Sequence, residues 1–279
     1  MDACSCGTAE PKNSPGSWWR ERTSGASRKS PRRSPMKSAR PSAEEVSPGN
    51  SLFPALALET STRPGSVALA LSQDRLLFRP LPGGGDLASH LLPALDSLAR
   101  EAGVEPGEVR LVVLGTGPGS FTGLRSGAAA AAVLSAYLPA PLVALSSLEG
   151  SPILSSHRRV ALCLDALRGQ VQGGVFQEGA PLFPPFLADP AEFAARIEGE
   201  EGVLAGNAAS RVFATGKVPP GWTLLEEADW TPRADLLLRR GLAYARKSAF
   251  TPPQDIQLLY LRPSAAAEKK RTPKTENHP

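Results

Sequence analysis

Residues 115–127, which read GTGPGSFTGLRSG, constrain the fold of this 279-residue chain more than any other stretch. They lie between the apolar run 112–114 and the alanine-rich run 128–137. Glycine allows backbone angles that a side chain forbids and proline fixes one angle, so the stretch predicts a tight turn. The local structure predicted here is a strand, this turn and a helix, with Ser120 capping the first turn of the helix.

The turn differs from both common phosphate-binding loops. The dinucleotide motif G-x-G-x-x-G, counted from Gly115, requires glycine where Ser120 stands. The P-loop requires a lysine near its end, and residues 115–127 contain none. The start of a helix can receive an anion, but the sequence of this turn does not identify a nucleotide site.

Two similar series of predicted elements follow each other along the chain. The first has strands at 52–58, 66–72 and 75–81, a helix at 87–102, a strand at 109–114, the glycine turn, a helix at 120–137 and a strand at 142–145. The second has strands at 159–164, 171–177 and 181–187, a helix at 189–197, and at 203–207 a strand-to-glycine step like the one at Gly115. Leu-x-Leu followed by an acid occurs in both, ending at Glu59 and at Asp165. This order predicts a duplicated α/β unit with mixed sheets flanked by helices, followed by a last helix at 233–247.

The ends of the chain differ in composition from its middle. Residues 1–51 are rich in Ser, Pro and Arg and predict a disordered arm, and residues 263–279 predict a disordered tail. The arm is either a nucleic-acid-binding or phosphorylation-controlled segment or a solvated leader without a specific role. Because the second methionine is Met36, translation from that residue is a further alternative. The predicted lobes are 52–147 and 148–262.

The charge and the cysteines restrict the classes of function. The arm carries nine Lys/Arg and five Asp/Glu and the tail four and two, so residues 52–262 carry 18 and 20. That count does not indicate a folded basic face for nucleic acid. Three cysteines without zinc-ligand spacing fit a reducing cytoplasm. No signal peptide is visible, and the longest apolar run is shorter than a bilayer requires, so no membrane association is predicted.

The glycine turn and the first strand together carry a family resemblance. Residues 117–127 (GPGSFTGLRSG) and 56–62 (LALETST) resemble the TsaB family, also called YeaZ, and the resemblance extends over 52–262. The glycine-turn signature consists of Gly117, Pro118, Gly119, Ser120, Phe121, Thr122 and Arg125. The resemblance implies two RNase H-like lobes of the actin-like ATPase fold.

The resemblance also implies a role in forming threonylcarbamoyladenosine in tRNA. The chain would be a non-catalytic scaffold that binds and activates TsaD, which transfers the threonylcarbamoyl group to N6 of adenosine 37 in tRNAs that read ANN codons. TsaC would supply the adenylate, TsaE would reset the complex, and tRNA would be reached through the complex. A homodimer would compete with the TsaD heterodimer for one surface. ATP and a metal are expected on partner subunits, and none is expected on this chain.

The hairpin after the first strand predicts a degenerate phosphate-binding site at Glu59, Thr60, Ser61 and Thr62. An actin-like ATPase places an acid where Glu59 stands, although the family usually has Asp there. The alternative is a structural turn, in which the three hydroxyls bond to their own backbone. Arg63-Pro64 stands where such a hairpin favours small residues, which argues against a working nucleotide site.

The predicted helices at 87–102 and 120–137 offer the best candidate surface for binding a partner. Small residues at helical spacing allow another helix to approach closely, or allow the helix to pack on its own sheet, and composition does not decide between the two. The resemblance favours partner binding. The predicted partner-binding residues are His90, Leu91, Leu95, Gly123, Leu124, Gly127, Ala128, Ala131 and Ser135.

An enzymatic function remains the main alternative. An ATP-dependent kinase of the same fold would use Glu59 and Asp165 as metal-facing acids, and a metallopeptidase-like protein would need a histidine pair. His90 belongs to no H-x-x-x-H or H-x-E-x-H motif, so it is interpreted as an interface residue, the alternative being an acid–base role. A third hypothesis is nucleic-acid binding through the arm.

Overall fold

The computed structural model describes residues 51–83, 87–138 and 140–261. The predicted tail at 263–279 and the predicted arm, apart from Ser51, lie outside the described residues. Within the described ranges, no helix combines the length and the apolar character needed to span a bilayer.

The first sheet is built from the first series of predicted elements. Its strands are β1 (Ala55–Glu59), β2 (Ser66–Ala70), β3 (Leu76–Pro80), β4 (Leu111–Gly115) and β5 (Leu142–Leu145). Their order is β3-β2-β1-β4-β5. The pairs β3–β2 and β2–β1 are antiparallel, and β1–β4 and β4–β5 are parallel. Strands β1, β2 and β4 are buried along their whole length, which explains their nearly continuous apolar sequences.

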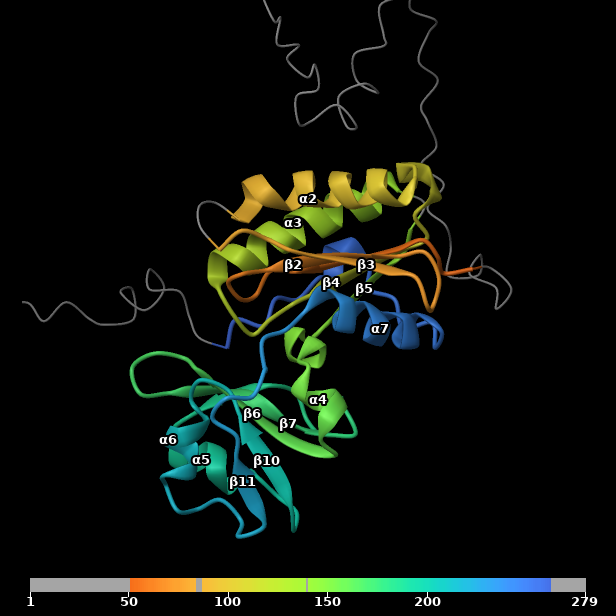
Figure 1. The fold of residues 1–279 in the computed structure, drawn as a ribbon. Helices are drawn as coiled ribbons and strands as arrows, with labels where there is room; N and C mark the ends of the chain where they lie inside the picture. Colours follow the sequence, from red (N-terminus) through yellow and green to blue (C-terminus); the bar gives the residue numbers. More distant parts are fainter. Residues whose placement is uncertain (1–50, 84–86, 139, 262–279) are drawn as a thin grey trace, which may run out of the picture. The chain divides into compact units, whose positions relative to one another are not determined.

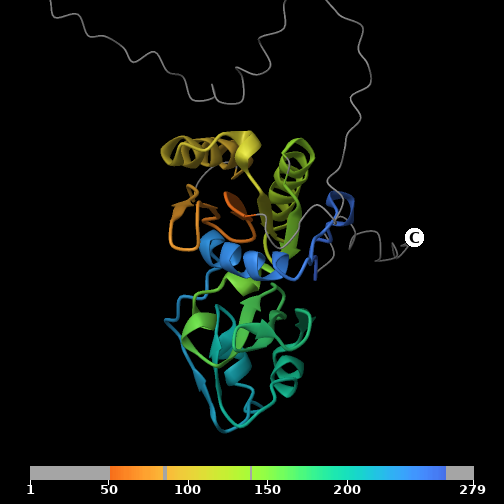
Figure 2. The ribbon, with the colours of Figure 1, turned by 90° about the vertical axis from the view of Figure 1, so that its right-hand side faces the viewer.

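Helices cover both faces of this sheet. Helices α2 (Leu87–Ala102) and α3 (Phe121–Tyr137) lie side by side over one face, and α7 (Ala234–Ala245) lies against the other (Figure 1, Figure 2). Helix α3 follows β4 through the glycine turn, as predicted.

The second sheet repeats the order of the first. Its strands are β6 (Arg159–Asp165), β7 (Val171–Gln177), β8 (Ala180–Pro181), β9 (Phe186–Ala188), β10 (Gly202–Ala205) and β11 (Trp222–Leu224). The order is β11-β10-β6-β7-β8, with β9 also paired to β7. The pair β6–β7 is antiparallel, and β10 is parallel to both neighbours. The short helices α5 (Pro190–Ala195) and α6 (Ala209–Phe213) accompany this sheet, and the predicted duplication is confirmed.

The second repeat departs from the predicted elements in two places. The single strand predicted at 181–187 is divided into β8 and β9, because Pro184 and Pro185 lie between them and donate no backbone hydrogen bond. Strand β11 is absent from the predicted elements, since it has three residues and follows a proline-rich segment.

Helix α7 packs on the first sheet although its sequence position lies in the predicted second lobe, 148–262. Leu237, Leu238 and Leu242 belong to the same core cluster as Ala57 and Val113. The Ala234 amide donates to the Ser66 hydroxyl at 2.9 Å, which ties the start of α7 to the start of β2. A boundary after residue 147 therefore does not divide the chain by sheet, because α7 follows the second sheet in sequence but packs on the first.

Candidate functional site

The glycine turn is bound to the hairpin that follows β1. Ser120 caps α3, because its hydroxyl accepts from the Gly123 amide at 3.4 Å. The Ser120 amide in turn donates to the carbonyl oxygen of Ser61 at 2.7 Å. The predicted cap is thus confirmed, and the same residue joins the turn to the hairpin.

Glycines in the turn and in α3 make this contact close. A Cβ on Gly123 would overlap the carbonyl oxygen of Thr60, and one on Gly127 would overlap the Thr60 hydroxyl. A Cβ on Gly119 would overlap the Ser61 carbonyl. These glycines therefore let the 60–61 backbone lie directly on the first turns of α3, within one molecule.

This contact changes the interpretation of the nine predicted partner-binding residues. Six of its members are buried inside the chain and cannot present a surface: Leu91, Leu95, Gly123, Leu124, Gly127 and Ala131. His90, Ala128 and Ser135 are half-buried. The small residues at helical spacing serve the packing of α3 on its own hairpin and sheet, which is the alternative that composition left open.

Other residues of α2 and α3 are exposed. Besides Phe121, which packs against Tyr260 at the start of α3, the large apolar side chains among them are Leu92, Val133 and Tyr137, which are 44%, 57% and 83% exposed. Ala129 and Ala136 are exposed on the same helix as Val133 and Tyr137. We call these five residues the α2–α3 outer face. The sequence prediction missed them, and the one available signal was a tyrosine at the end of an alanine-rich run.

Glu59 ends β1 and is 0% exposed. One carboxylate oxygen accepts from the Ser61 amide at 2.6 Å, and the other lies against Gly115, where a Cβ would overlap it. Burial raises the pKa of this carboxyl, and hydrogen bonds from Ser61 and Ser147 offset only part of the effect. Glu59 is therefore an internal structural group and has no access to solvent.

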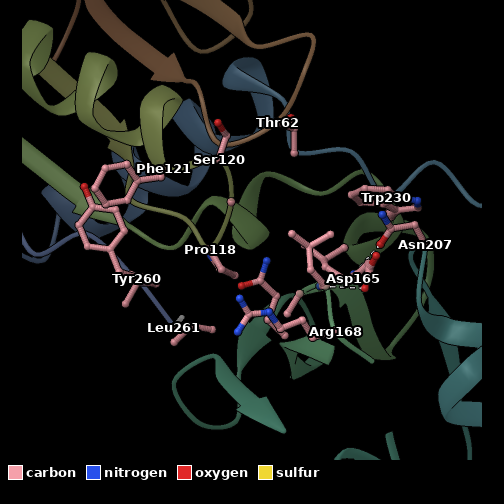
Figure 3. A pocket seen from close by; sticks show the side chains of 16 residues that line it. Thr62, Pro118, Ser120, Phe121, Asp165, Arg168, Asn207, Trp230, Tyr260 and Leu261 are labelled. Atoms are coloured by element: carbon pink, nitrogen blue, oxygen red, sulfur yellow. Dashed lines mark hydrogen bonds between the residues drawn. The ribbon is translucent and has the colours of Figure 1, made fainter. Parts of the chain in front are cut away.

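A cleft of about 570 Å³ lies next to the glycine turn (Figure 3). Pro118, Ser120 and Phe121 line it from the turn, and Arg168 lines it from the connection between β6 and β7. Trp230 contributes a further aromatic side chain to the lining. Of the predicted site residues, the structure places Thr62, Pro118, Gly119, Ser120 and Phe121 at this cleft.

The segment before Arg262 closes one side of the cleft. Leu259 donates its amide to the Thr116 carbonyl at 2.9 Å, beside the glycine turn. The centre of the Tyr260 ring lies 4.8 Å from the centre of the Phe121 ring, and the Arg125 guanidinium lies 5.1 Å from that same Phe121 centre. The exposed start of α3 is therefore fixed by the end of the described chain.

Asp165 ends β6 at the position that Glu59 occupies in β1. Its carboxylate accepts from Arg211 at 2.6 Å and from the Leu167 amide at 3.0 Å. The hydrogen bond from Arg211 lowers the pKa of Asp165. The Asp165 amide donates to the Asn207 side chain at 2.8 Å, so the end of β6 is joined to the turn that follows β10.

The residues at the cleft do not fit the magnesium nucleotide that an actin-like ATPase, the fold implied by the family resemblance, would bind. Such a ligand requires carboxylates that face the cleft, whereas Glu59 is enclosed and Asp165 is engaged by Arg211. Across the described ranges, no three His, Cys, Asp or Glu side chains gather as a group that could hold a metal ion.

Comparison with known proteins gives related sequences over part of the chain. A family model described as TsaD, tRNA N6-adenosine threonylcarbamoyltransferase, matches residues 86–180. The Bacillus subtilis protein "tRNA threonylcarbamoyladenosine biosynthesis protein TsaB" is 36% identical over 88 residues, or 31% of this chain. The Haemophilus influenzae protein of the same name is 34% identical over 120 residues, or 42% of this chain. The matches span 38% and 50% of the lengths of these two relatives.

Solved structures cover more of the chain. YeaZ from Pseudomonas aeruginosa has a TM-score of 0.61 and 26% identity, over 72% of this chain and 95% of its own. A second Pseudomonas aeruginosa structure, described as an uncharacterized protein with similarity to peptidase YeaZ, has a TM-score of 0.64 and 27% identity. It covers 75% of this chain and 99% of its own.

Proposed function

Because relatives named TsaB, the YeaZ structures and a TsaD-type family model together support a member of the TsaB/YeaZ family, we propose that this chain takes part in threonylcarbamoyladenosine formation in tRNA. Its role in that process is to bind and activate TsaD as a non-catalytic subunit. TsaE acts on the same complex, and tRNA is reached through it.

The burial of Glu59 supports a non-catalytic role. A general acid, a general base or a metal ligand must reach the substrate or the ion, and this carboxyl is 0% exposed. The surrounding Thr60 and Ser61 are likewise buried, under the first turns of α3. The family signature in the glycine turn therefore serves to fix the position of α3.

One observation carries the partner-binding proposal: α2 and α3 pack on the first sheet and expose large apolar side chains. Tyr137 is 83% exposed and Val133 is 57% exposed on one helix. Aromatic and branched apolar residues at the centre of an interface contribute most of its binding energy. The α2–α3 outer face is the surface proposed for TsaD and, in competition with it, for a second copy of this chain.

Charge introduced on this face should prevent the association. The double substitution Val133→Glu/Tyr137→Glu is expected to weaken binding to TsaD by at least about thirtyfold, since buried carboxylates and a lost aromatic anchor act together. Co-purification and titration calorimetry with TsaD measure the effect. Gly127 is unsuitable for this test, because a side chain there collides with Thr60 and tests folding.

A matched control is available on the second repeat. Leu182 and Phe213 are 48% and 41% exposed, so Leu182→Glu/Phe213→Glu introduces the same two charges at exposed apolar positions elsewhere. The control should bind TsaD like the wild-type chain. If Val133→Glu/Tyr137→Glu also bound TsaD like the wild-type chain, the proposed surface would be wrong.

The activating role is tested by reconstitution. Purified TsaC, TsaD, TsaE and unmodified tRNA should form threonylcarbamoyladenosine only slowly without this chain and rapidly with it. Full activity in its absence would refute the proposal. Calorimetry with Mg-ATP and the isolated chain distinguishes this proposal from the kinase-like alternative. A kinase must bind Mg-ATP by itself, and the enclosed Glu59 does not favour such binding.

A further inference from the structure

Helix α7 has two faces of opposite character. Its buried face, which includes Leu237, Leu238 and Gly241, lies on the first sheet. Arg239 is exposed on the opposite side of the helix, and Arg246 and Lys247 are exposed at its C-terminal end. We call Arg239, Arg246 and Lys247 the α7 basic face.

The three side chains of the α7 basic face are not neutralised. No ion pair joins any of them to another residue within 51–83, 87–138 or 140–261. Arginines elsewhere do have such partners: Arg211 pairs with Asp165 and Arg196 with Glu192. Arg240, on the same helix, is attracted by the Glu149 carboxylate and is therefore left out of the face.

The overall charge of residues 52–262 does not reveal this face. That segment carries 18 basic and 20 acidic residues, which argued against a folded nucleic-acid surface. A net count does not describe where the charges lie, and three unpaired cations within nine positions make a local positive potential. The positions 239–247 span about 12 Å along a helix axis, enough for contacts with more than one phosphate.

The first described residues pack on the core cluster that α7 covers. Leu52 and Phe53 pack against the cluster that includes Leu242 and Ala245 of α7, as do Tyr244 and Phe250. The preceding residues 1–51 carry nine Lys/Arg against five Asp/Glu. The basic part of the sequence at 1–51 thus directly precedes residues that pack on the same cluster as α7.

We infer that the α7 basic face binds the phosphate backbone of structured RNA. This inference rests on the proposed function, in which the partner RNA is the tRNA substrate. Phosphate backbones are recognised by Lys and Arg through charge, with little demand on sequence. A membrane surface fits less well, because the exposed apolar residue between these cations is only Ala243, and interfacial helices need bulky apolar side chains.

The test compares two triple substitutions in the full chain, with fluorescently labelled, unmodified tRNA as the probe. The first is Arg239→Gln/Arg246→Gln/Lys247→Gln. The control, Arg63→Gln/Arg75→Gln/Lys217→Gln, removes the same charge from exposed positions elsewhere. Anisotropy titrations at several salt concentrations give the slope of log affinity against log salt.

The α7 substitution should lower the magnitude of that slope by about 2–3 and weaken binding near 0.1 M salt about tenfold or more, because up to three phosphate contacts are lost. The control should change neither quantity. Equal effects of the two substitutions, or no effect of the α7 substitution, would overturn the inference. The inference would also be overturned if the α7 substitution abolished binding to phosphatidylserine vesicles and left tRNA binding unchanged.

Two further readouts distinguish RNA binding by α7 from a purely structural role of its cations. Cations at a helix C-terminus also stabilise the helix, so a purely structural role would lower the melting temperature without changing the salt slope. In the reconstituted reaction, the α7 variant should raise the KM for tRNA and retain activity at saturating tRNA. The wild-type chain could fail to stimulate TsaD while the α7 and control variants still differ in tRNA binding. In that case the proposed function fails and RNA binding by α7 stands.

Discussion

Gly123→Ala is expected to lower the free energy of unfolding by about 2 kcal/mol or more, the upper part of the range for overpacked sites. In an open helix the same change would stabilise by about 1 kcal/mol, because alanine is the better helix former. The sign reverses here because the new Cβ meets the carbonyl oxygen of Thr60, which is backbone and cannot rotate away. Urea denaturation measures the difference, and the melting temperature should fall by about 4–8 °C.

Gly107→Ala is the matched control, since a Cβ at Gly107 has no atom within 4 Å. It should change the free energy of unfolding by no more than about 0.5 kcal/mol. A second comparison uses Thr60→Ala, which removes the hydroxyl that a Cβ on Gly127 would meet but leaves the carbonyl that opposes Gly123. Thr60→Ala should therefore partly rescue Gly127→Ala and not Gly123→Ala. Equal behaviour of Gly123→Ala and Gly107→Ala would contradict the close contact.

The order of the elements could be predicted from the sequence because each series combines clear signals. Helix α2 has leucines at helical spacing, and α3 has a glycine-containing start with a serine cap, so the predicted bounds of both agree with the structure to within one residue. The repeated Leu-x-Leu-acid pattern predicted the duplication that the two sheets display. Short elements with weak signals, such as β11, could not be predicted.

The direction in which α3 faces could not be predicted. Residues 128–132 are all alanine, so the helix has no polar side that would identify its solvent face. Small residues at the spacing of Gly123 and Gly127 suit contact with a partner and contact with the same chain equally well. Only the position of Thr60, which comes from a hairpin distant in sequence, distinguishes the two.

The packing of α7 was hidden for a similar reason. Its leucines predict a helix with one buried side but do not identify the sheet that buries it. Contacts between Leu237 and the cluster containing Ala57 join residues about 180 positions apart. The basic face of α7 follows from that packing, because the buried side fixes which side remains exposed.

Glu59 and Asp165 end equivalent strands in the two repeats, yet their carboxyl groups respond to pH in opposite directions. Burial raises the pKa of Glu59, so its contribution to stability is fully present below the unfolded value of 4.5 and is lost as pH rises through the folded pKa. The hydrogen bond from Arg211 lowers the pKa of Asp165, so its contribution is present above the unfolded value of 3.8 and is lost as pH falls.

Substitution by the neutral amide should therefore separate the two acids. Glu59→Gln should gain stability relative to wild type as pH rises from 5 to 8, by about 1.4 kcal/mol for each unit of pKa elevation that it removes. Asp165→Asn should lose stability relative to wild type at pH 7, and the loss should shrink toward pH 3, where the wild-type carboxylate also becomes protonated. Urea denaturation across this pH range measures both series. A Glu59→Gln difference that does not change with pH would mean that this carboxyl is solvated, and the enclosed hairpin on which the non-catalytic role depends would then be wrong.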